Sequence, residues 1–496
     1  MSLTPNHPSH RSRALALVMA LACASCTVGP DYRRPPVTMP SVFKERPSPE
    51  STLATEWRTA RPSDDAVRTK WWEAFQDPLL SSLIEQVAIS NQTVAQAEAQ
   101  FRAARAAIRN ARADQFPTVT AGASATRSRS SGTGGAVPVA GGTIVDYQLA
   151  IDFSYEADLW GRVRRNVESS VASAQASSAD VQTALLSSQA ELAMDYFELR
   201  GHDAQIALLQ STLTAFERAL QLTRARHDQG VASGVDVAQA QTQLDTTRVQ
   251  ATDLQIARAQ FEHAIAILVG QAPADLTIPS AVVEMSPPAV PLALPSQLVE
   301  RRPDVAAAER RVAAANAQIG VAQAAFFPTL ILTASGGLQS SMLSTLLTLP
   351  SRFWAIGPAL AETVFDGGRR RSVKEQAIAT YDGTVAVYRQ STLTAFQDVE
   401  DNLAALRVLA DEAAQARAAV ASANRSLELA NKQYLGGVTT YLEVITAQTA
   451  ALTNQITAAN VLTRRMTASV LLIKALGGGW STAELAHADA LRAPRP

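Results

Sequence analysis

The sequence of 496 residues predicts an α+β fold in which long helices and a few short strands form two copies of one plan. Three observations predict it. A turn and the helix after it occur twice, starting at Gly230 and at Gly437; alanine-rich stretches run far without proline; and two pairs of short segments alternate between apolar and polar residues. Because the repeat extends over most of the chain, we expect two half-units of one architecture rather than several unrelated domains.

The repeat is clearest from Gly230 to Thr242, a segment that returns from Gly437 to Thr449. Both copies have Gly-Val, four free positions, a carboxylate, Val, two free positions and Ala-Gln-Thr. In the helix after each copy, positions spaced alternately by three and four residues form a coiled-coil seam. The exceptions in this seam also match, since Arg258 corresponds to Arg465. A repeat of turn and helix together indicates a duplicated unit.

Composition favours closely packed helices and argues against several functions. Aromatic residues make up 5% of the chain and hydrophobic residues 47%, many of them alanine, which has a high helix propensity and lets helices approach closely. A net charge of −1 does not suggest a nucleic-acid partner. The six histidines show no metal-ligand spacing, and no phosphate loop or nucleophile elbow is present. We therefore expect no enzymatic activity, no cofactor and no metal.

The ends and linkers divide the chain into segments. A basic start, a short apolar stretch and small residues predict a secretory leader that is too short to span a bilayer. Both cysteines, Cys23 and Cys26, lie at its end, so the rest of the chain has no disulfide. The expected segments are a signal peptide over 1–25, a Pro-rich tether over 26–70, a first structural repeat over 71–270, a Pro-rich linker over 271–303, a second structural repeat over 304–476 and a tail over 477–496.

Each repeat begins with a helix that ends at Phe-Pro-Thr, because the residue before a proline favours extended geometry. We expect the first of these helices to run unbroken from Leu79 to Gln115 and the second to start near Val305. Further on, proline-free helices are expected from Val163 to Gln229 and from Ser372 to Leu435. At about 1.5 Å per residue, each could reach on the order of 100 Å. That length is on the scale of a periplasm.

Strands follow each Phe-Pro-Thr stop. Over 147–155 the odd positions are apolar and most others are polar or acidic, which predicts a strand with one apolar face. We expect its partner over 119–127, joined to it by a Gly-rich loop over 131–142, and a second hairpin with strands around 330–334 and 354–360. A membrane barrel needs this alternation. The alternative is a half-buried hairpin of a soluble sandwich.

Four strands cannot close a barrel, and open sheet edges are not tolerated in hydrocarbon. Two chains would give roughly eight strands, whose interior is filled by side chains, whereas three would give about twelve, with room for an aqueous lumen. The sequence therefore predicts an α+β membrane channel, with a homotrimer as the smallest assembly that conducts.

These features together resemble the outer-membrane factor (TolC-type) family of tripartite efflux systems, in its lipoprotein branch. The resemblance covers nearly the whole mature chain and rests on Cys26-Thr27-Val28-Gly29-Pro30, the duplicated hairpin and helix, the Asp366-Gly367-Gly368-Arg369 turn and the two Gly-Val turns. It implies a trimeric twelve-stranded β-barrel, four strands per chain, continued by a long periplasmic α-helical barrel. It implies two partners, a periplasmic adaptor (membrane fusion) protein and an inner-membrane transporter of the RND type.

The resemblance also implies that Cys26 is acylated, which would anchor the chain in the outer membrane while its body extends into the periplasm. Ala24 and Ser25 fit the positions before a lipidated cysteine, although Cys23 stands where the pattern prefers leucine. A lone exposed thiol is a liability in an oxidising compartment, which favours acylation. The alternative is an ordinary signal peptide cleaved near Ala22 that leaves Cys26 free.

Two turns from strand to helix combine an aromatic residue, glycine and a basic cluster. We expect them at the membrane interface, with these residues: Trp160, Arg162, Arg164 and Arg165 in the first copy, and Arg369, Arg370 and Arg371 in the second. Because cations are unfavourable at a helix N-terminus, we expect lipid phosphate at the inner surface of the outer membrane to compensate them. The alternative is that the arginines are simply solvated.

The resemblance places a periplasmic gate and the adaptor contact at the repeated turns. The family closes its periplasmic mouth with inward carboxylates, and Asp236 and Glu443 stand at matching positions. Where the second repeat of the family commonly has another Asp, this chain has Thr446. The alternative role of both carboxylates is to accept backbone hydrogen bonds at a helix start. The turns Gly230-Val231 and Gly437-Val438 are the expected adaptor-docking sites.

The function that the resemblance implies is an outer-membrane channel of a tripartite efflux pump, which exports drugs or other toxic compounds from the periplasm to the exterior. Within the same architecture, type I protein secretion and metal efflux are alternatives. A periplasmic coiled-coil adaptor or scaffold is an alternative of a different class, and it predicts one helical hairpin with compact β domains.

Overall fold

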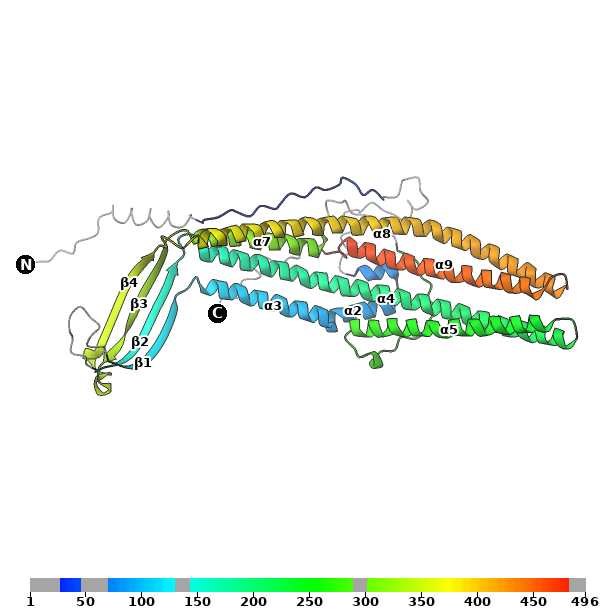
Figure 1. Ribbon diagram of the computed structural model, residues 1–496, viewed down its shortest axis with the longest axis horizontal. Helices are drawn as coiled ribbons and strands as arrows, with labels where there is room; N and C mark the ends of the chain where they lie inside the picture. Colours follow the sequence, from blue (N-terminus) through cyan, green and yellow to red (C-terminus); the bar gives the residue numbers. More distant parts are fainter. Residues whose placement is uncertain (1–26, 46–69, 130–142, 289–300, 481–496) are drawn as a thin grey trace, which may run out of the picture.

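Long helices lie side by side along one axis, and a four-stranded sheet stands at one end of them (Figure 1). The predicted signal peptide, residues 1–25, and Cys26 lie outside the part of the chain that the structure describes. In the described part, no helix combines the length and the apolar character needed to cross a membrane. The computed structural model describes residues 27–45, 70–129, 143–288 and 301–480.

The sheet joins the two halves of the chain. It is antiparallel, in the order β1-β2-β3-β4, so that the second strand of the first hairpin pairs with the first strand of the second hairpin. All four predicted strands are confirmed and extend a few residues beyond the expected bounds. The strands are β1 (Thr118–Arg129), β2 (Thr143–Ala157), β3 (Thr329–Ser340) and β4 (Arg352–Ala361), with two short helices, η5 (Leu343–Thr345) and η6 (Leu349–Ser351), between β3 and β4.

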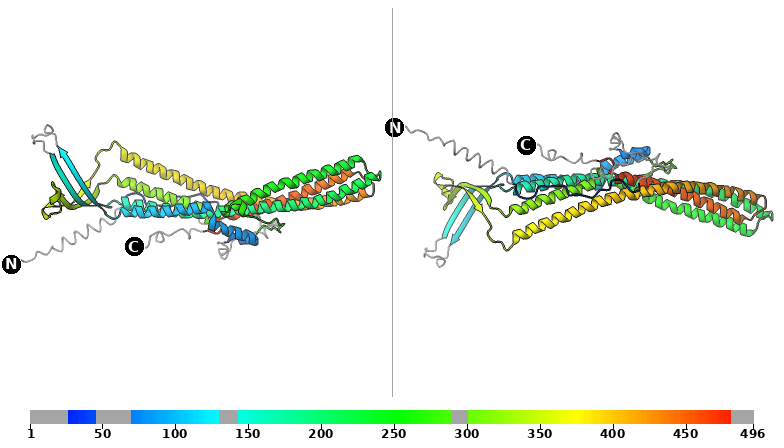
Figure 2. Two further views of the ribbon diagram at one scale, coloured as in Figure 1. Left: turned by 90° about the horizontal axis from the view of Figure 1, so that it is seen from below. Right: turned by 90° about the horizontal axis from the view of Figure 1, so that it is seen from above.

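Each half continues into a long helix and a return helix. The first half forms α4 (Arg162–Asp228) and α5 (Gly234–Leu268), and the second forms α8 (Arg369–Leu435) and α9 (Tyr441–Ala475). Both long helices contain 67 residues, so each spans about 100 Å, as the sequence predicts. Both helical hairpins turn at the end of the molecule furthest from the sheet (Figure 2).

The helix expected from Leu79 to Gln115 is in fact two helices, so the prediction of an unbroken run was wrong. The structure has α2 (Pro78–Ser90) and α3 (Gln92–Ala113), separated at Asn91. The Asn91 side chain accepts hydrogen bonds from the N–H groups of Thr93 and Val94, at 2.9 and 3.1 Å, and thereby caps α3. Asparagine is among the best N-cap residues, so the sequence did contain a signal for this break, although no proline or glycine marks it.

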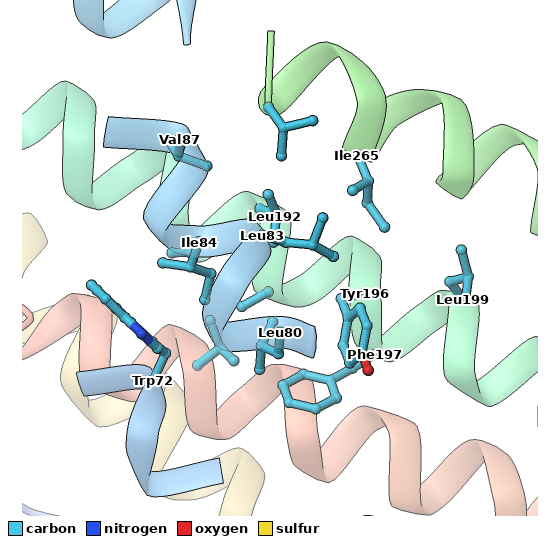
Figure 3. Packing of buried hydrophobic residues seen from close by; sticks show 14 of the residues in the cluster. Trp72, Leu80, Leu83, Ile84, Val87, Leu192, Tyr196, Phe197, Leu199 and Ile265 are labelled. Carbon is cyan, nitrogen blue, oxygen red and sulfur yellow. The ribbon is translucent and has the colours of Figure 1, made fainter. Parts of the chain in front are cut away.

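The largest apolar core lies midway along the helices, where the short helix η3 (Trp71–Phe75) and α2 pack against α4 (Figure 3). Leucine, isoleucine and valine side chains of α2 contact aromatic and leucine side chains of α4. The Tyr196 hydroxyl donates to the Asp77 carboxylate at 2.6 Å, and the same carboxylate caps α2. In α7 (Pro303–Ala324) most buried positions are alanine, which lets this helix lie close to α4.

Residues 27–45 form an extended strap that lies along the helices, drawn in dark blue beside α8 (Figure 1). As expected for this part of the tether, the strap has no helix or strand. It is nevertheless held at both ends. The Val28 N–H donates to the Trp160 carbonyl at 3.1 Å, and Phe43 is buried against apolar side chains of α8 and α9. The strap therefore fixes residue 27 beside the sheet end of α4.

Candidate functional site

The sheet has one apolar face, and the pairing register defines it. Residues directly opposite each other in antiparallel strands point to the same side. The predicted alternation in each strand is confirmed, and the register joins the four apolar rows into one surface. That surface is formed by Val119, Ala121, Ala123 and Ala125 of β1, Tyr147, Leu149, Ile151, Phe153 and Tyr155 of β2, Leu330, Leu332, Ala334 and Leu338 of β3, and Trp354, Ile356, Pro358 and Leu360 of β4.

The opposite face is polar on β1, β2 and β3. It carries threonine, serine and glutamine together with Asp146, Asp152 and Glu156, and the Gln339 side chain donates to the Asp146 carboxylate at 3.1 Å. A soluble sandwich would bury the apolar face, yet Trp354 of that face is 79% exposed in the chain. One face suited to lipid and one suited to water form the wall of a membrane barrel.

Both edges of the sheet are open. Among the described residues, β1 pairs only with β2 and β4 pairs only with β3. Each open edge presents a row of backbone N–H and C=O groups without partners, which hydrocarbon does not tolerate. The sheet is therefore one part of a barrel that further chains must complete.

In the turn from β2 to α4, charged side chains pair with each other and with backbone groups of the same turn. The two oxygens of the Asp158 carboxylate accept hydrogen bonds from the N–H groups of Val163 and Arg164, at 3.1 and 2.9 Å, at the start of α4. The Arg162 guanidinium makes two hydrogen bonds of 2.8 Å to the Glu156 carboxylate. A carboxylate at a helix N-terminus is favourable because of the helix dipole.

The remaining predicted residues of this turn also have partners within the chain. Arg165 is buried and pairs with Asp31 of the strap at 2.9 Å and with Glu168 at 2.7 Å. The Trp160 ring stacks on Phe327, with 4.7 Å between ring centroids, and its indole N–H donates to the Pro328 carbonyl. Trp160 thus links the first turn to the start of β3.

The turn from β4 to α8 has the same arrangement of hydrogen bonds and ion pairs. The Asp366 carboxylate accepts hydrogen bonds from the N–H groups of Gly368 and Arg370, at 3.0 and 3.2 Å, and the Arg370 side chain pairs with both Asp366 and Glu362. The argument that an external anion is needed was therefore wrong, because Asp158 and Asp366 supply the negative charge at both helix starts. A location of these residues at the membrane interface stays a prediction.

The two Gly-Val turns have the same backbone geometry. Gly230 and Gly437 have φ of +75° and +72°, in the left-handed region that favours glycine. The N–H of Val231 donates to the carbonyl five residues back at 2.8 Å, and that of Val438 does so at 2.9 Å. This pattern is a Schellman motif, which ends α4 and α8 abruptly. Both valine side chains are exposed at the far end of the helical hairpins.

The two predicted gate carboxylates differ in their local bonding. Asp236 belongs to a capping box: its carboxylate accepts from the Ser233 N–H at 2.9 Å, while its own N–H donates to the Ser233 hydroxyl at 3.2 Å. The second copy has no such box, since Thr440 makes no side-chain capping bond at the start of α9. Among the described residues, the exposed Glu443 carboxylate has no hydrogen-bond or ion-pair partner. Glu443 is therefore the carboxylate free to interact with a neighbouring chain or a permeating ion.

Sequence reasoning missed a contact between the two hairpins near these turns. The Arg226 guanidinium of α4 lies 4.7 Å from the Tyr434 ring centroid of α8 and donates to the Tyr434 carbonyl at 3.2 Å. The Tyr434 and Tyr441 rings are 5.3 Å apart. Burial, the Tyr434 hydroxyl and the Asp236 carboxylate raise the pKa of Tyr441 to about 12. Because Arg226, Tyr434 and Tyr441 do not recur at the matching positions of the other repeat, the repeat gave no signal for their contact.

A buried charge network holds the linker after the first repeat. The Asp203 carboxylate of α4 accepts from Arg258 of α5 at 2.7 Å, from Arg200 at 2.9 Å and from Ser280 of the linker at 2.8 Å. Arg258, an exception in the predicted seam, also donates to the carbonyl of Ile278 in the linker at 2.6 Å. The exception thus has a structural role in fixing the linker to both helices.

One alternative from the sequence, the periplasmic adaptor, can now be compared with the structure. The described residues form two helical hairpins and one four-stranded sheet, so the interpretation as an adaptor, which predicts one hairpin and compact β domains, was wrong. Within the described residues, histidine, cysteine and carboxylate side chains form no group that could hold a metal ion.

Comparison with known proteins places these features in context. Residues 83–271 and 294–478 match the family model described as outer membrane efflux protein, so the model aligns once with each structural repeat. The toluene efflux pump outer membrane protein TtgF of Pseudomonas putida is 34% identical over 477 residues, which cover 95% of this chain and 97% of TtgF. Outer membrane protein OprJ of Pseudomonas aeruginosa is 33% identical over 479 residues, covering 94% of this chain and 95% of OprJ.

Solved structures give the same result. The outer-membrane channel OprN superposes with a TM-score of 0.83 at 31% identity, over 92% of this chain and all of that one. The open state of the MtrE outer membrane channel of Neisseria gonorrhoeae superposes with a TM-score of 0.79 at 27% identity, over 92% of this chain and 98% of that one.

Proposed function

The chain belongs to the outer membrane efflux protein family, and on that premise we propose that it is the outer-membrane channel of a tripartite efflux pump. The observation that carries the proposal is the sheet: one apolar face, one polar face and two open edges. Three chains supply about twelve strands, enough to close a barrel around an aqueous lumen. The helices continue the channel from the outer membrane into the periplasm.

The partners follow from this role. The channel works as a homotrimer with a periplasmic adaptor protein and an inner-membrane transporter, which we propose to be of the RND type. Its cargo is small toxic molecules, because TtgF is named for toluene efflux and another relative, ArpC of Pseudomonas putida, for antibiotic efflux. The family is one of channels rather than enzymes, and we propose that this chain has no catalytic activity.

The periplasmic mouth is the proposed site of gating and docking. Glu443 supports a gate role because its carboxylate is exposed and free, whereas Asp236 is engaged in its capping box. The contact between Arg226 and Tyr434 joins the two helical hairpins near the mouth, and it would have to break if the hairpins separate. The turns Gly230-Val231 and Gly437-Val438 are the proposed adaptor contacts, since each turn exposes an apolar valine side chain at the tip of its hairpin.

The proposed lipid anchor on Cys26 fits the position of the strap. Thr27 packs against Gly161, so close that a Cβ at Gly161 would lie 2.7 Å from the Thr27 side chain. Thr27, the residue that follows Cys26 in the sequence, therefore lies beside the turn from β2 to α4. We propose that an acyl chain on Cys26 enters the membrane beside the barrel.

The function is tested by complementation. A strain that lacks its own outer-membrane channels should export a fluorescent hydrophobic dye when it produces this chain with its adaptor and transporter. Detergent-extracted protein should migrate as a heat-modifiable trimer from the outer-membrane fraction. Unchanged dye accumulation with a correctly assembled trimer would refute the efflux role.

A further inference from the structure

The distal rim of the sheet, at the strand ends away from the helices, carries three arginines on the apolar face. Arg129 is the last residue of β1, Arg127 lies two positions before it, and Arg352 is the first residue of β4. Two-residue steps keep a side chain on one face. Arg127 therefore continues the row of Ala125, and Arg352 begins the row of Trp354.

The register confirms this assignment across strands. Arg352 lies opposite Leu338 of β3, which lies opposite Leu149 of β2, and both leucines belong to the apolar face. Arg127 lies opposite Val145, two residues before Tyr147 of the same face. The lipid-facing surface thus ends in guanidinium groups at both the first and the last strand of each chain.

These arginines have no counter-charge within the described part of the chain. All three are exposed, and among the described residues none of them has an ion-pair or hydrogen-bond partner. The apolar face contains no carboxylate, because the sheet's acidic side chains, such as Asp146 and Asp152, lie on the opposite face. At the other end of the sheet the situation is reversed, since Arg162 and Arg370 pair with carboxylates of their own chain.

Strand length places the rim at the membrane surface. A tilted strand crosses the hydrocarbon in about 9–11 residues, and β4 has 10. An arginine facing lipid is costly at the middle of the bilayer but costs little at the interface. Arg352, at one end of β4, therefore lies in the lipid headgroup layer, while the apolar Trp354 and Ile356 lie deeper, in the hydrocarbon.

We propose that Arg127, Arg129 and Arg352 bind the phosphate groups of anionic glycolipid in the outer leaflet around the barrel rim. Guanidinium groups donate pairs of hydrogen bonds to phosphate oxygens. The occupant is a lipid rather than a soluble anion, because the arginines continue a lipid-facing apolar surface. This inference rests on the proposed function, which places the sheet in the outer membrane.

The test uses the purified full-length trimer in neutral detergent. Lipid retention is measured by native mass spectrometry with diphosphoryl lipid A and with the same lipid after removal of its phosphates. The test variant carries Arg127→Gln, Arg129→Gln and Arg352→Gln. The control carries Arg218→Gln, Arg389→Gln and Arg417→Gln, which remove the same charge from exposed positions on the long helices.

The wild type and the control should retain the phosphorylated lipid preferentially. Each basic residue strengthens binding to an anionic lipid surface about five-fold, so the test variant should bind on the order of 100-fold more weakly. Equal retention of both lipids by the wild type would overturn the proposal even if the test variant failed to assemble. The proposal would also be overturned if the control lost as much of the phosphorylated lipid as the test variant, or if millimolar inorganic phosphate displaced the lipid.

Channel function is measured separately, as the conductance of each trimer in bilayers of neutral phosphatidylcholine. A test variant that conducts like the wild type but no longer retains the phosphorylated lipid supports the proposal. Failure of both the wild-type and the Glu443→Gln trimers to conduct would refute the channel role, while the lipid measurement would still decide the role of the arginines.

Discussion

Replacing Asp203 by alanine should destabilise the trimer through the buried charge network. The carboxylate is fully buried and accepts hydrogen bonds from Arg258, Ser280, Arg200 and the N–H of Ala281, at 2.7, 2.8, 2.9 and 3.2 Å. Without it, the Arg200 side chain, only 3% exposed, would lose its counter-charge. Removing one partner of a buried ion pair costs about 3–5 kcal/mol. We expect a loss of this size for each chain.

The assay is thermal unfolding of detergent-purified trimers, followed by circular dichroism. An unfolding entropy of about 2.1 cal/mol/K per residue gives about 1 kcal/mol/K for 496 residues, so the Tm should fall by roughly 3–5 °C. The control is Asp245→Ala, which removes an exposed carboxylate paired with Arg248 at 3.3 Å and should cost about 0–1 kcal/mol. Equal changes of Tm in the two variants would refute the reasoning.

The same network predicts a pH dependence. Burial by itself would raise the pKa of Asp203, but the donors from Arg258, Ser280, Ala281 and Arg200 outweigh it and lower the pKa. Since the folded pKa lies below the unfolded value of about 4, the stabilisation is present above pH 4 and is lost as the pH falls through the folded pKa. The difference in Tm between the wild type and Asp203→Asn should therefore be constant near neutral pH and narrow only below about pH 4.

Three further predictions concern the periplasmic mouth and the helix break. Glu443→Gln should raise the passive conductance of trimers in planar bilayers more than Asp236→Asn, because only the Glu443 carboxylate is free; equal conductances would contradict a gate at Glu443. Val231→Trp with Val438→Trp should block dye export at an unchanged trimer yield, whereas export at the wild-type rate would place adaptor docking elsewhere. Asn91→Ala should cost about 1 kcal/mol in thermal unfolding through the lost cap of α3, and an unchanged Tm would show that the break does not depend on the cap.

The local patterns of the sequence predicted the elements well, for identifiable reasons. Alternation of apolar and polar residues predicted the strands because side chains of a strand point alternately to two faces. The missed break at Asn91 had a local signal as well, since asparagine followed by an alanine-rich helix is a capping pattern. Proline and glycine, taken as the only markers of a helix break, do not reveal this pattern.

The charges were harder to interpret from sequence, because their partners are distant in the chain. The arginines after β2 and β4 suggested an external anion, yet Asp158 and Asp366 cap α4 and α8 and supply the negative charge at both helix starts. Arg258 looked like an irregularity of the seam until its partners Asp203 and Ile278 were placed beside it. Contacts between residues far apart in sequence leave no periodic signal.

The sequence by itself determined the duplication, the long helices, the four alternating strands and the two Gly-Val turns, because each depends on the conformation of neighbouring residues. Only the tertiary structure decided which similar residues have different roles. Pairing register set the arginines of the distal rim on the apolar face without partners, and capping geometry engaged Asp236 while leaving Glu443 free. The role of a charged side chain depends on the groups around it, and only the fold brings those groups together.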